Sequence, residues 1–349
     1  MPPESRQVRL AARPVGLPAD SAWAFTSEPV PEPGPGELVV RVAYVSLDPA
    51  MRGWMDDVRS YLPPVGLGDV MRAGGVGEVV ASSHPTLAVG DWVTGAFGVQ
   101  TYARSDGTGV VRVDPALAPL PTYLGVLGAP GMTAYFGLLD VGRAVSGDTV
   151  VVSGAAGAVG TVVGQIAKIL GCRVIGIAGG AEKTRWLTEE LGFDAAVDYK
   201  SADVRKELRA LCPNGIDVYF DNVGGEILDA ALARLARGAR VVICGAISQY
   251  NATGGVRGPA NYLNLLVSRA SMTGFVVFDY ADRYAEAAQV MAGWMAEGRL
   301  LARTDLVQGI DAFPAALRGL FAGANTGKLV LQVGPEQPEQ AGRPTPATP

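Results

Sequence analysis

Residues 148–183 read DTVVVSGAAGAVGTVVGQIAKILGCRVIGIAGGAEK and contain two apolar runs separated by a glycine-rich turn. The first run, residues 149–153, is β-branched, which is typical of a buried strand. Apolar residues then recur at helical spacing as far as Gly171, and residues 173–177 form the second run. A strand, turn, helix and strand within about 30 residues predict a site for the pyrophosphate of a dinucleotide at the helix N-terminus.

The glycines of this turn are spaced G-x-x-G-x-x-G, at Gly154, Gly157 and Gly160, rather than G-x-G-x-x-G. The alternative is a glycine-rich turn in an ordinary α/β domain. Their position directly between a strand and a helix favours the cofactor site. A membrane span over residues 150–167 is disfavoured, because glycine and polar residues interrupt the run and charged residues bracket it.

The end of the second strand indicates which nicotinamide cofactor fits. NAD sites carry Asp or Glu near this point, to bind the ribose 2′-hydroxyl. Here Ile177 is followed by Ala178, Gly179 and Gly180 without an acid, and Lys183 comes shortly after. The glycines leave room for a 2′-phosphate and Lys183 can pair with it, so the sequence predicts NADP. The alternative for Lys183 is an ordinary solvated lysine.

Composition narrows the class of protein. The chain has 349 residues, 48% hydrophobic and 18% charged, which is typical of a globular protein of two domains. A net charge of −5 argues against nucleic acid as a partner. No apolar run follows Met1, so we expect no secretory signal. The odd set of dispersed cysteines favours a reducing cytoplasm over a disulfide framework.

Candidate metal ligands are scarce. A zinc site needs about three or four clustered Cys or His ligands. This chain has Cys172, Cys212 and Cys244 in separate elements and a single histidine, His84. We therefore expect no metal, and any carbonyl group in a substrate must be polarised by hydrogen-bond donors.

Two patterns divide the chain. Short alternating runs between glycine and proline turns, at residues 37–46, 74–80 and 91–95, predict that residues 1–130 form a small antiparallel barrel. From residue 131 to 298 strands alternate with helices, which predicts an α/β fold with a doubly wound parallel sheet. Strands are expected at 149–153, 173–177, 195–198, 216–220, 239–244 and 272–277, and helices at 158–170, 181–191, 201–211, 225–236 and 281–297.

The C-terminal part has two further features. Residues 299–333 end in a strand-like run, 328–333, which we expect to rejoin the first domain. Residues 334–349 are rich in proline and lack apolar periodicity, which predicts a disordered tail.

Six stretches along the chain form a specific set in this order: residues 45–54 (VSLDPAMRGW), 128–135 (GAPGMTAY), 152–171 (VSGAAGAVGTVVGQIAKILG), 220–225 (FDNVGG), 244–251 (CGAISQYN) and 323–330 (GANTGKLV). Together they resemble the zinc-independent medium-chain dehydrogenase/reductases, and within them the prostaglandin reductase and 2-alkenal reductase group. The resemblance implies a Rossmann domain inserted in a β-rich, GroES-like barrel domain, with NADP in the cleft between them. Plant members often carry a tyrosine where this chain has Ala50, so the shape of the substrate stays open.

The resemblance also implies cofactor contacts. It places Gly157, Ala158 and Val159 at the pyrophosphate, and Lys183 and Tyr199 at the 2′-phosphate beside Gly179. The remaining contacts would be Asn222 beyond the fourth strand, Cys244, Gly245, Ile247, Ser248, Phe275, Val276 and Val277 around the nicotinamide half, and Asn325 closing over it. From the residues alone, Asn222 could be a turn residue and residues 275–277 could be core residues of the sixth strand.

A tyrosine is the expected hydrogen-bond donor to the substrate. Hydride addition to the β-carbon of an enone collects negative charge on the carbonyl oxygen, where a fixed donor favours the transition state. A tyrosine hydroxyl can donate without carrying charge. Tyr262, in the loop 254–266 beyond the fifth strand, is the first candidate. Tyr250 is the second candidate, and Tyr61 could face the same cleft from the first domain, although each could be an ordinary half-buried side chain.

The expected function is NADPH-dependent reduction of the C=C bond of medium to large apolar α,β-unsaturated ketones or aldehydes. Two alternatives stay open, a quinone reductase with the same cofactor site and a non-catalytic NADPH-binding protein. The apolar run 273–278 could pair across a two-fold axis, so we expect a homodimer. No nucleic-acid or membrane partner is expected.

Overall fold

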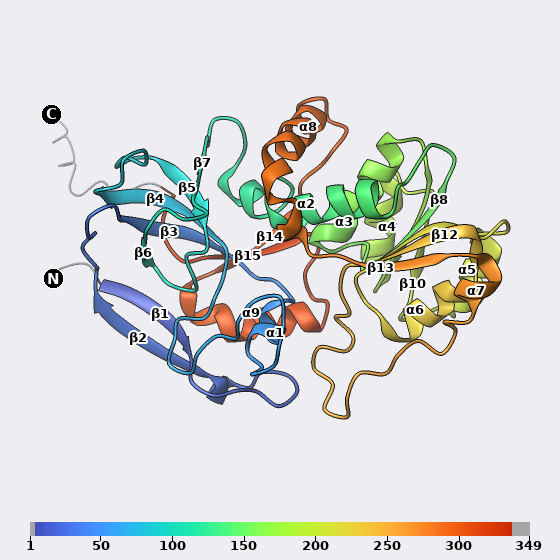
Figure 1. Cartoon of the computed structure of the whole chain (residues 1–349), viewed down its shortest axis with the longest axis horizontal. Helices are drawn as coiled ribbons and strands as arrows, with labels where there is room; N and C mark the ends of the chain where they lie inside the picture. Colours follow the sequence, from blue (N-terminus) through green and yellow to red (C-terminus); the bar gives the residue numbers. More distant parts are fainter. Residues whose placement is uncertain (1–3, 337–349) are drawn as a thin grey trace, which may run out of the picture.

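The computed structural model describes residues 4–336, which form two bodies side by side (Figure 1). One body holds the N-terminal strands together with the last strands of the chain, and the other holds alternating strands and helices. The expected disordered tail lies outside the described residues from position 337 onward.

The second body is built on a six-stranded parallel sheet. Its strand order is β10 (Ala195–Asp198), β9 (Arg173–Ala178), β8 (Thr149–Ser153), β11 (Ile216–Asp221), β12 (Leu235–Ile243) and β13 (Ser271–Gly274). In chain order this is 3-2-1-4-5-6, the order of a doubly wound dinucleotide-binding sheet. The order reverses between β8 and β11, so their carboxyl ends are where a ligand is expected.

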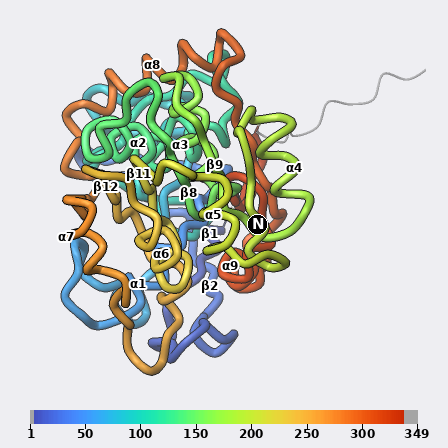
Figure 2. The backbone as a smooth tube through the Cα atoms, turned by 90° about the vertical axis from the view of Figure 1, so that its right-hand side faces the viewer, coloured from blue at the N-terminus to red at the C-terminus, as the bar shows by residue number. Residues whose placement is uncertain are grey.

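Helices cover both faces of this sheet (Figure 2). Val150 and Val152 of β8 pack in one core with α2 (Ala129–Phe136), α3 (Ala158–Ile169) and α8 (Tyr284–Ala296). Val151, which points to the opposite face, packs with α5 (Val204–Leu211) and α6 (Gly225–Leu232). The same face carries α7 (Asn264–Ser268), and α4 (Ala181–Glu189) follows β9. None of the helices within residues 4–336 combines the length and apolarity that crossing a membrane requires.

The first body contains a seven-stranded sheet. Its order is β14 (Thr304–Gln308), β15 (Lys328–Gln332), β3 (Leu38–Ser46), β4 (Gly75–Ser82), β5 (Trp92–Gly95) and β7 (Val111–Val113), and β6 (Tyr102–Ser105) also pairs with β3. The strands within residues 4–130 pair antiparallel, as predicted for this part of the chain. The sheet as a whole is mixed, because the C-terminal strands β14 and β15 pair in parallel. β15 joins the N-terminal strands through antiparallel pairing with β3. The domain limits 1–130 with 299–333, and 131–298, stay predictions.

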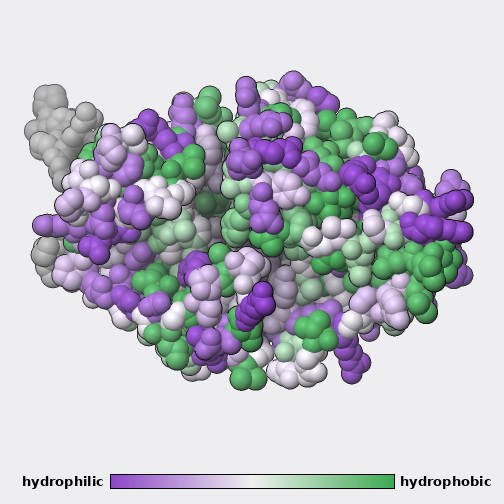
Figure 3. Space-filling model, viewed as in Figure 1, coloured by the Kyte–Doolittle hydropathy of each residue, from purple (hydrophilic) through white to green (hydrophobic). Residues whose placement is uncertain are grey.

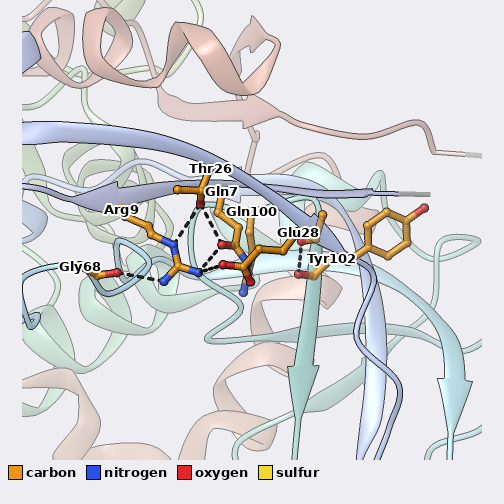
Figure 4. A network of polar contacts seen from close by, with 8 residues as sticks. Gln7, Arg9, Thr26, Glu28, Gly68, Gln100 and Tyr102 are labelled. Atoms are coloured by element: carbon orange, nitrogen blue, oxygen red, sulfur yellow. Dashed lines mark hydrogen bonds and ion pairs between the residues drawn. The ribbon is translucent and has the colours of Figure 1, made fainter. Parts of the chain in front are cut away.

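Two helices and a separate hairpin complete the first body. α9 (Phe313–Phe321) packs in its core, and α1 (Met51–Trp54) carries the buried Met51. The hairpin of β1 (Glu4–Leu10) and β2 (Trp23–Pro29) is fixed by the Arg9 guanidinium, as Figure 4 shows. Arg9 donates to Thr26 Oγ1 at 3.0 Å, to Glu28 at 2.7 Å and to the Gly68 carbonyl at 2.9 Å.

Several predicted limits differ from the structure. β12 begins at Leu235, because Ile216 pairs with Leu235 while Val218 pairs with Arg240, which leaves a bulge containing Gly238 at φ +77°. The preceding helix therefore ends at Leu232 rather than at residue 236. The helix expected at 201–211 begins at Val204, because the Asp203 carboxylate accepts the Lys206 N–H at 3.2 Å and caps it. A 3-10 helix over 277–283 precedes α8 and delays its start to Tyr284.

The sixth strand was also predicted too long. β13 ends at Gly274, and its residues are exposed at the edge of the sheet. Phe275 then leaves the strand and sets its ring edge-on to Phe220, with 6.5 Å between ring centroids. Residues 275–277 are therefore half-buried residues beyond the strand, not part of it.

Candidate cofactor and active site

The glycine turn after β8 forms the first part of the site. Gly154 has φ +59°, a conformation that favours glycine, and Gly157 is the N-cap of α3. A Cβ on Gly160 would collide with the Gly154 carbonyl, so the helix rests directly on the turn. Gly157, Ala158 and Val159 thus stand at a helix start whose first amides have no intrahelical acceptor. This arrangement fits a pyrophosphate.

The C-terminal segment of the first body lies against this turn. Gly157 forms a parallel bridge with Gly327, whose N–H donates to the Ala156 carbonyl at 2.8 Å. Asn325 is buried, and its Nδ2 donates to the Gly327 carbonyl at 2.9 Å. The segment that carries Asn325 therefore lies against the glycine turn. The expected position of Asn325 over the nicotinamide half stays a prediction.

A pocket of about 460 Å³ lies beyond β9, lined by residues 179–183, 303–305, 324 and 326. Lys183 is half-buried there, and its Nζ donates to the Gly323 carbonyl at 2.7 Å. Burial, followed by the neighbouring Lys200, lowers the pKa of Lys183. A Cβ on Gly179 would lie 2.9 Å from the Tyr199 ring and from Lys200 Cε. Gly179, Lys183 and Tyr199 are thus brought together, and they fit a 2′-phosphate.

A buried carboxylate organises the ends of β8 and β11. Asp221 is 1% exposed and accepts the Ser153 hydroxyl at 2.8 Å and the Tyr219 hydroxyl at 3.0 Å. Next to it, Asn222 donates its Nδ2 to the Ser153 carbonyl at 2.7 Å and its N–H to Ser153 Oγ at 2.9 Å. Asn222 is therefore held at the point where the strand order reverses.

The turn after β12 packs on these residues. The N–H groups of Cys244 and Gly245 donate to the Asp221 carbonyl at 2.9 and 3.0 Å. The Ile247 N–H donates to the Asn222 carbonyl at 3.2 Å, and Ser248 Oγ donates to the Val223 carbonyl at 2.6 Å. Burial raises the pKa of the Cys244 thiol to about 12, so this thiol stays protonated and lacks the character of a nucleophile.

Tyr250 lies directly against this turn. Its hydroxyl oxygen accepts the Ala246 N–H at 3.1 Å, and a Cβ on Gly245 would come within 2.9 Å of that oxygen. Within residues 4–336 the hydroxyl proton is donated to no other group, so it is available to a ligand. Burial raises the pKa of Tyr250 and outweighs the bond from the Ala246 N–H, which lowers it, so the hydroxyl keeps its proton at neutral pH.

The other two tyrosines differ in their surroundings. Tyr61 is 52% exposed, and its ring centroid lies 6.3 Å from that of Phe278, across from its own body. Tyr262 is 56% exposed and stands just before α7, next to Asn261, which donates to the Asp229 carbonyl of α6 at 2.9 Å. Tyr250 is thus held against the turn after β12, Tyr61 lies against Phe278, and Tyr262 lies next to the contact with α6. The role of each tyrosine stays a prediction.

Two residues of the site, Asp221 and Arg303, were not predicted from the sequence. Asp221 belongs to the FDNVGG stretch, but nothing in the local pattern distinguishes a buried carboxylate from a turn residue. Arg303 lines the pocket beside Lys183 and belongs to no motif. Only the packing of the two bodies brings it there.

Residues 6–113 match a family model described as the N-terminal domain of oxidoreductase, and residues 158–293 match one described as zinc-binding dehydrogenase. The NADPH-dependent curcumin reductase of Escherichia coli is 43% identical over 334 residues, covering 94% of this chain and 97% of that protein. The NADP⁺-dependent 2-alkenal reductase of Nicotiana tabacum is 40% identical over 310 residues, covering 88% of this chain and 90% of that protein. The crystal structure of CurA from Vibrio vulnificus in complex with NADPH has a TM-score of 0.90 and 48% identity, covering 95% of this chain and 99% of that chain.

The chain belongs to the medium-chain dehydrogenase/reductase family, in the zinc-independent group that its motifs resemble. It is an NADP-dependent oxidoreductase, and the predictions of fold class and cofactor are confirmed. The segment matched by the zinc-binding model contains Cys172, Cys212 and Cys244 but no histidine. Among residues 4–336 no group of three or more His, Cys, Asp or Glu side chains could hold a metal ion.

Proposed function

We propose that this protein reduces the C=C bond of α,β-unsaturated ketones and aldehydes with a hydride from NADPH. The observation that carries the proposal is the Tyr250 hydroxyl, which is kept protonated beside the turn 244–248 and has its proton free for a ligand oxygen. The name of the tobacco relative gives a 2-alkenal, an α,β-unsaturated aldehyde, as its substrate, which supports the same class here.

The residues of the site divide the work of this reaction. Bound NADPH supplies the hydride. The start of α3 and Lys183 would hold its phosphates, and the turn 244–248 with residues 275–277 would enclose the nicotinamide half. Tyr250 donates a hydrogen bond to the substrate carbonyl oxygen, where negative charge collects as the β-carbon accepts hydride. The α-carbon then takes its proton from water or from this tyrosine.

The test measures NADPH consumption with an enone and with a quinone. We expect turnover of the enone, with both hydrogens added across the C=C bond. Turnover of the quinone alone would favour a quinone reductase. Tight NADPH binding without turnover of either compound would favour a non-catalytic role.

The substrate and assembly proposals concern the surface around the site. Residues 45–67 and 254–266 are proposed to line the substrate pocket, and both are rich in apolar and glycine residues. The homodimer also stays a proposal. It is supported by the exposed edge strand β13 and by an apolar patch over α7 and β13, visible in Figure 3, to which Leu266, Val267 and Met272 contribute with 76%, 66% and 39% exposure.

Replacing Lys183 by alanine should raise the KM for NADPH about tenfold to a hundredfold, because a charge-assisted bond to phosphate contributes roughly 1.5–3 kcal/mol. The KM for NADH should stay nearly unchanged. Steady-state kinetics with both cofactors measure the effect. Lys206→Ala is the control, because Lys206 is exposed on α5 away from this pocket. Equal use of both cofactors by the unmodified protein would reject the role given to Lys183.

Dialysis against a strong chelator should leave the rate of NADPH-dependent turnover unchanged. The reason is the scarcity of ligands, since the chain has one histidine and three dispersed cysteines whereas zinc needs about three or four clustered ligands. Metal analysis of the purified protein accompanies the assay. Stoichiometric zinc that is lost together with activity would contradict this prediction.

A further inference from the structure

Arg303 enters the pocket beside Lys183 from the opposite body. It lies between α8 and β14, on the segment that leads into the mixed sheet. The pocket wall formed by residues 303–305 faces the wall formed by residues 179–183, which includes the glycines and Lys183. A cation from each body therefore lines the same pocket.

The backbone around Arg303 is fixed on both sides. The Leu301 N–H donates to Gln165 Oε1 at 2.7 Å, and Gln165 Nε2 donates to the Leu301 carbonyl at 3.1 Å, which ties the segment to α3. The Lys328 N–H donates to the Arg303 carbonyl at 2.9 Å, which ties it to β15. The guanidinium carbon lies 4.9 Å from the centroid of the Trp186 ring on α4. Stacking on this ring restricts the orientation of the guanidinium.

The positive charge of Arg303 is not neutralised by an ion pair with a described residue. Within residues 4–336 the Arg303 guanidinium takes part in no ion pair. Lys200 is close enough to lower the pKa of Lys183, so two lysines and Arg303 gather at this end of the site. Glu182 and Asp305 also face the pocket, and Asp305 Oδ2 accepts the Thr326 N–H at 3.3 Å. The arrangement leaves the fork of the guanidinium available to an anion.

We propose that Arg303 binds the 2′-phosphate of NADP together with Lys183, so that this phosphate is held from both bodies. The proposal rests on the NADP-dependent function given above. A guanidinium presents a planar fork of donors that matches phosphate oxygens in pairs, whereas a lysine acts as a point charge. The stacked arginine would thus add oriented hydrogen bonds to the positive charge that Lys183 supplies. These bonds would make Arg303 a determinant of cofactor specificity.

The experiment titrates the protein by calorimetry with adenosine 2′,5′-bisphosphate and with adenosine 5′-monophosphate. These two probes differ in the 2′-phosphate and need no catalysis. For Arg303→Gln we expect binding of the bisphosphate to weaken about five- to thirtyfold, less than for a buried pair because solvent screens an exposed arginine. Binding of the monophosphate should change less than about twofold. Arg303→Lys should show an intermediate loss, because it keeps the charge without the fork.

Arg299→Gln is the matched control, since Arg299 is exposed on the same segment and pairs with Glu297 instead. It should bind both probes as the wild type does. Melting curves of all variants report on folding. Unchanged binding of both probes by Arg303→Gln, or an equal loss for both, would overturn the proposal. Equal binding of both probes by the wild type would reject any recognition of the 2′-phosphate in this pocket. Failure of enone reduction alone would leave these binding results unaffected.

Discussion

Replacing Tyr250 by phenylalanine is expected to lower kcat for enone reduction by a factor on the order of 10²–10³, the usual effect of removing one donor from a developing oxyanion. Binding of NADPH should change little, because the Tyr250 hydroxyl bonds with the Ala246 N–H and not with the residues expected around the cofactor phosphates. Single-turnover rates and NADPH titrations with the same preparations separate the two effects.

The size of this effect depends on where the hydroxyl proton can go. The Tyr250 oxygen already accepts a backbone N–H, which orients the hydroxyl and leaves its proton for a ligand. Burial raises the pKa of Tyr250, so the donor form persists at neutral pH and is lost only under alkaline conditions. A donor held in place before the reaction stabilises the transition state without reorganisation, and a water that entered the variant would replace part of it.

Tyr262→Phe and Tyr61→Phe are the matched variants. Both remove one hydroxyl from a tyrosine that is more than half exposed. A rate loss in Tyr262→Phe with an unimpaired Tyr250→Phe would return the donor role to the first candidate from the sequence. A loss only in Tyr61→Phe would assign the donor to the first body.

Deuterated NADPH identifies the carbon that accepts the hydride. Deuterium at the β-carbon of the product is expected for the wild type and for the slow Tyr250→Phe variant alike, because the donor changes the barrier and not the site of addition. Deuterium on the carbinol carbon would reject reduction of the double bond.

The parallel sheet was predictable because its signals are local. Thr149–Ser153 and Arg173–Ala178 are short apolar strands buried on both faces, and the glycine turn follows β8 without a gap. β13 carried a weaker signal, because an edge strand of four exposed residues has no face to bury and its apolar neighbour Phe275 packs elsewhere. The mixed character of the first sheet depended on β14, whose parallel partner β15 follows a helix in between.

The sequence motifs predicted which residues form the site, but not how their side chains are arranged. Lys183, Tyr199 and Gly179 belong to neighbouring strand ends of one sheet, so parallel topology alone brings them together. The ranking of the tyrosines could not come from position along the chain, because Tyr250 and Tyr262 both follow β12. Their difference comes from the turn that holds the hydroxyl of Tyr250 and from the contact of Asn261 with α6. Arg303 depended on packing between bodies, which no local pattern encodes.

Replacing Asp221 by alanine is expected to lower the free energy of unfolding by roughly 3–5 kcal/mol, because several buried donors lose their acceptor at once. The carboxylate accepts the Ser153 and Tyr219 hydroxyls at 2.8 and 3.0 Å and the N–H groups of Val223 and Gly224 at 3.1 and 3.0 Å. The midpoint and slope of urea unfolding, followed by tryptophan fluorescence, measure the loss. Asp217→Ala is the control on the same strand, because the Asp217 carboxylate accepts one hydrogen bond, from the Thr149 N–H at 2.8 Å.

The effect of Tyr219→Phe on the free energy of unfolding distinguishes a loss of hydrogen bonds from a simple loss of packing. In the wild type, Tyr219→Phe removes one hydrogen bond to Asp221 and should destabilise the protein by about 1 kcal/mol. In the Asp221→Ala background the Tyr219 hydroxyl has lost this acceptor inside a fully buried side chain, so the same substitution should restore part of the stability. An additive double mutant would mean that the two side chains act independently. Recovery of stability, in contrast, would show that the end of β11 depends on the hydrogen bonds of the Asp221 carboxylate. Asp221→Ala should also weaken NADP binding, because Asn222 and the turn 244–248 are held to the same strand end.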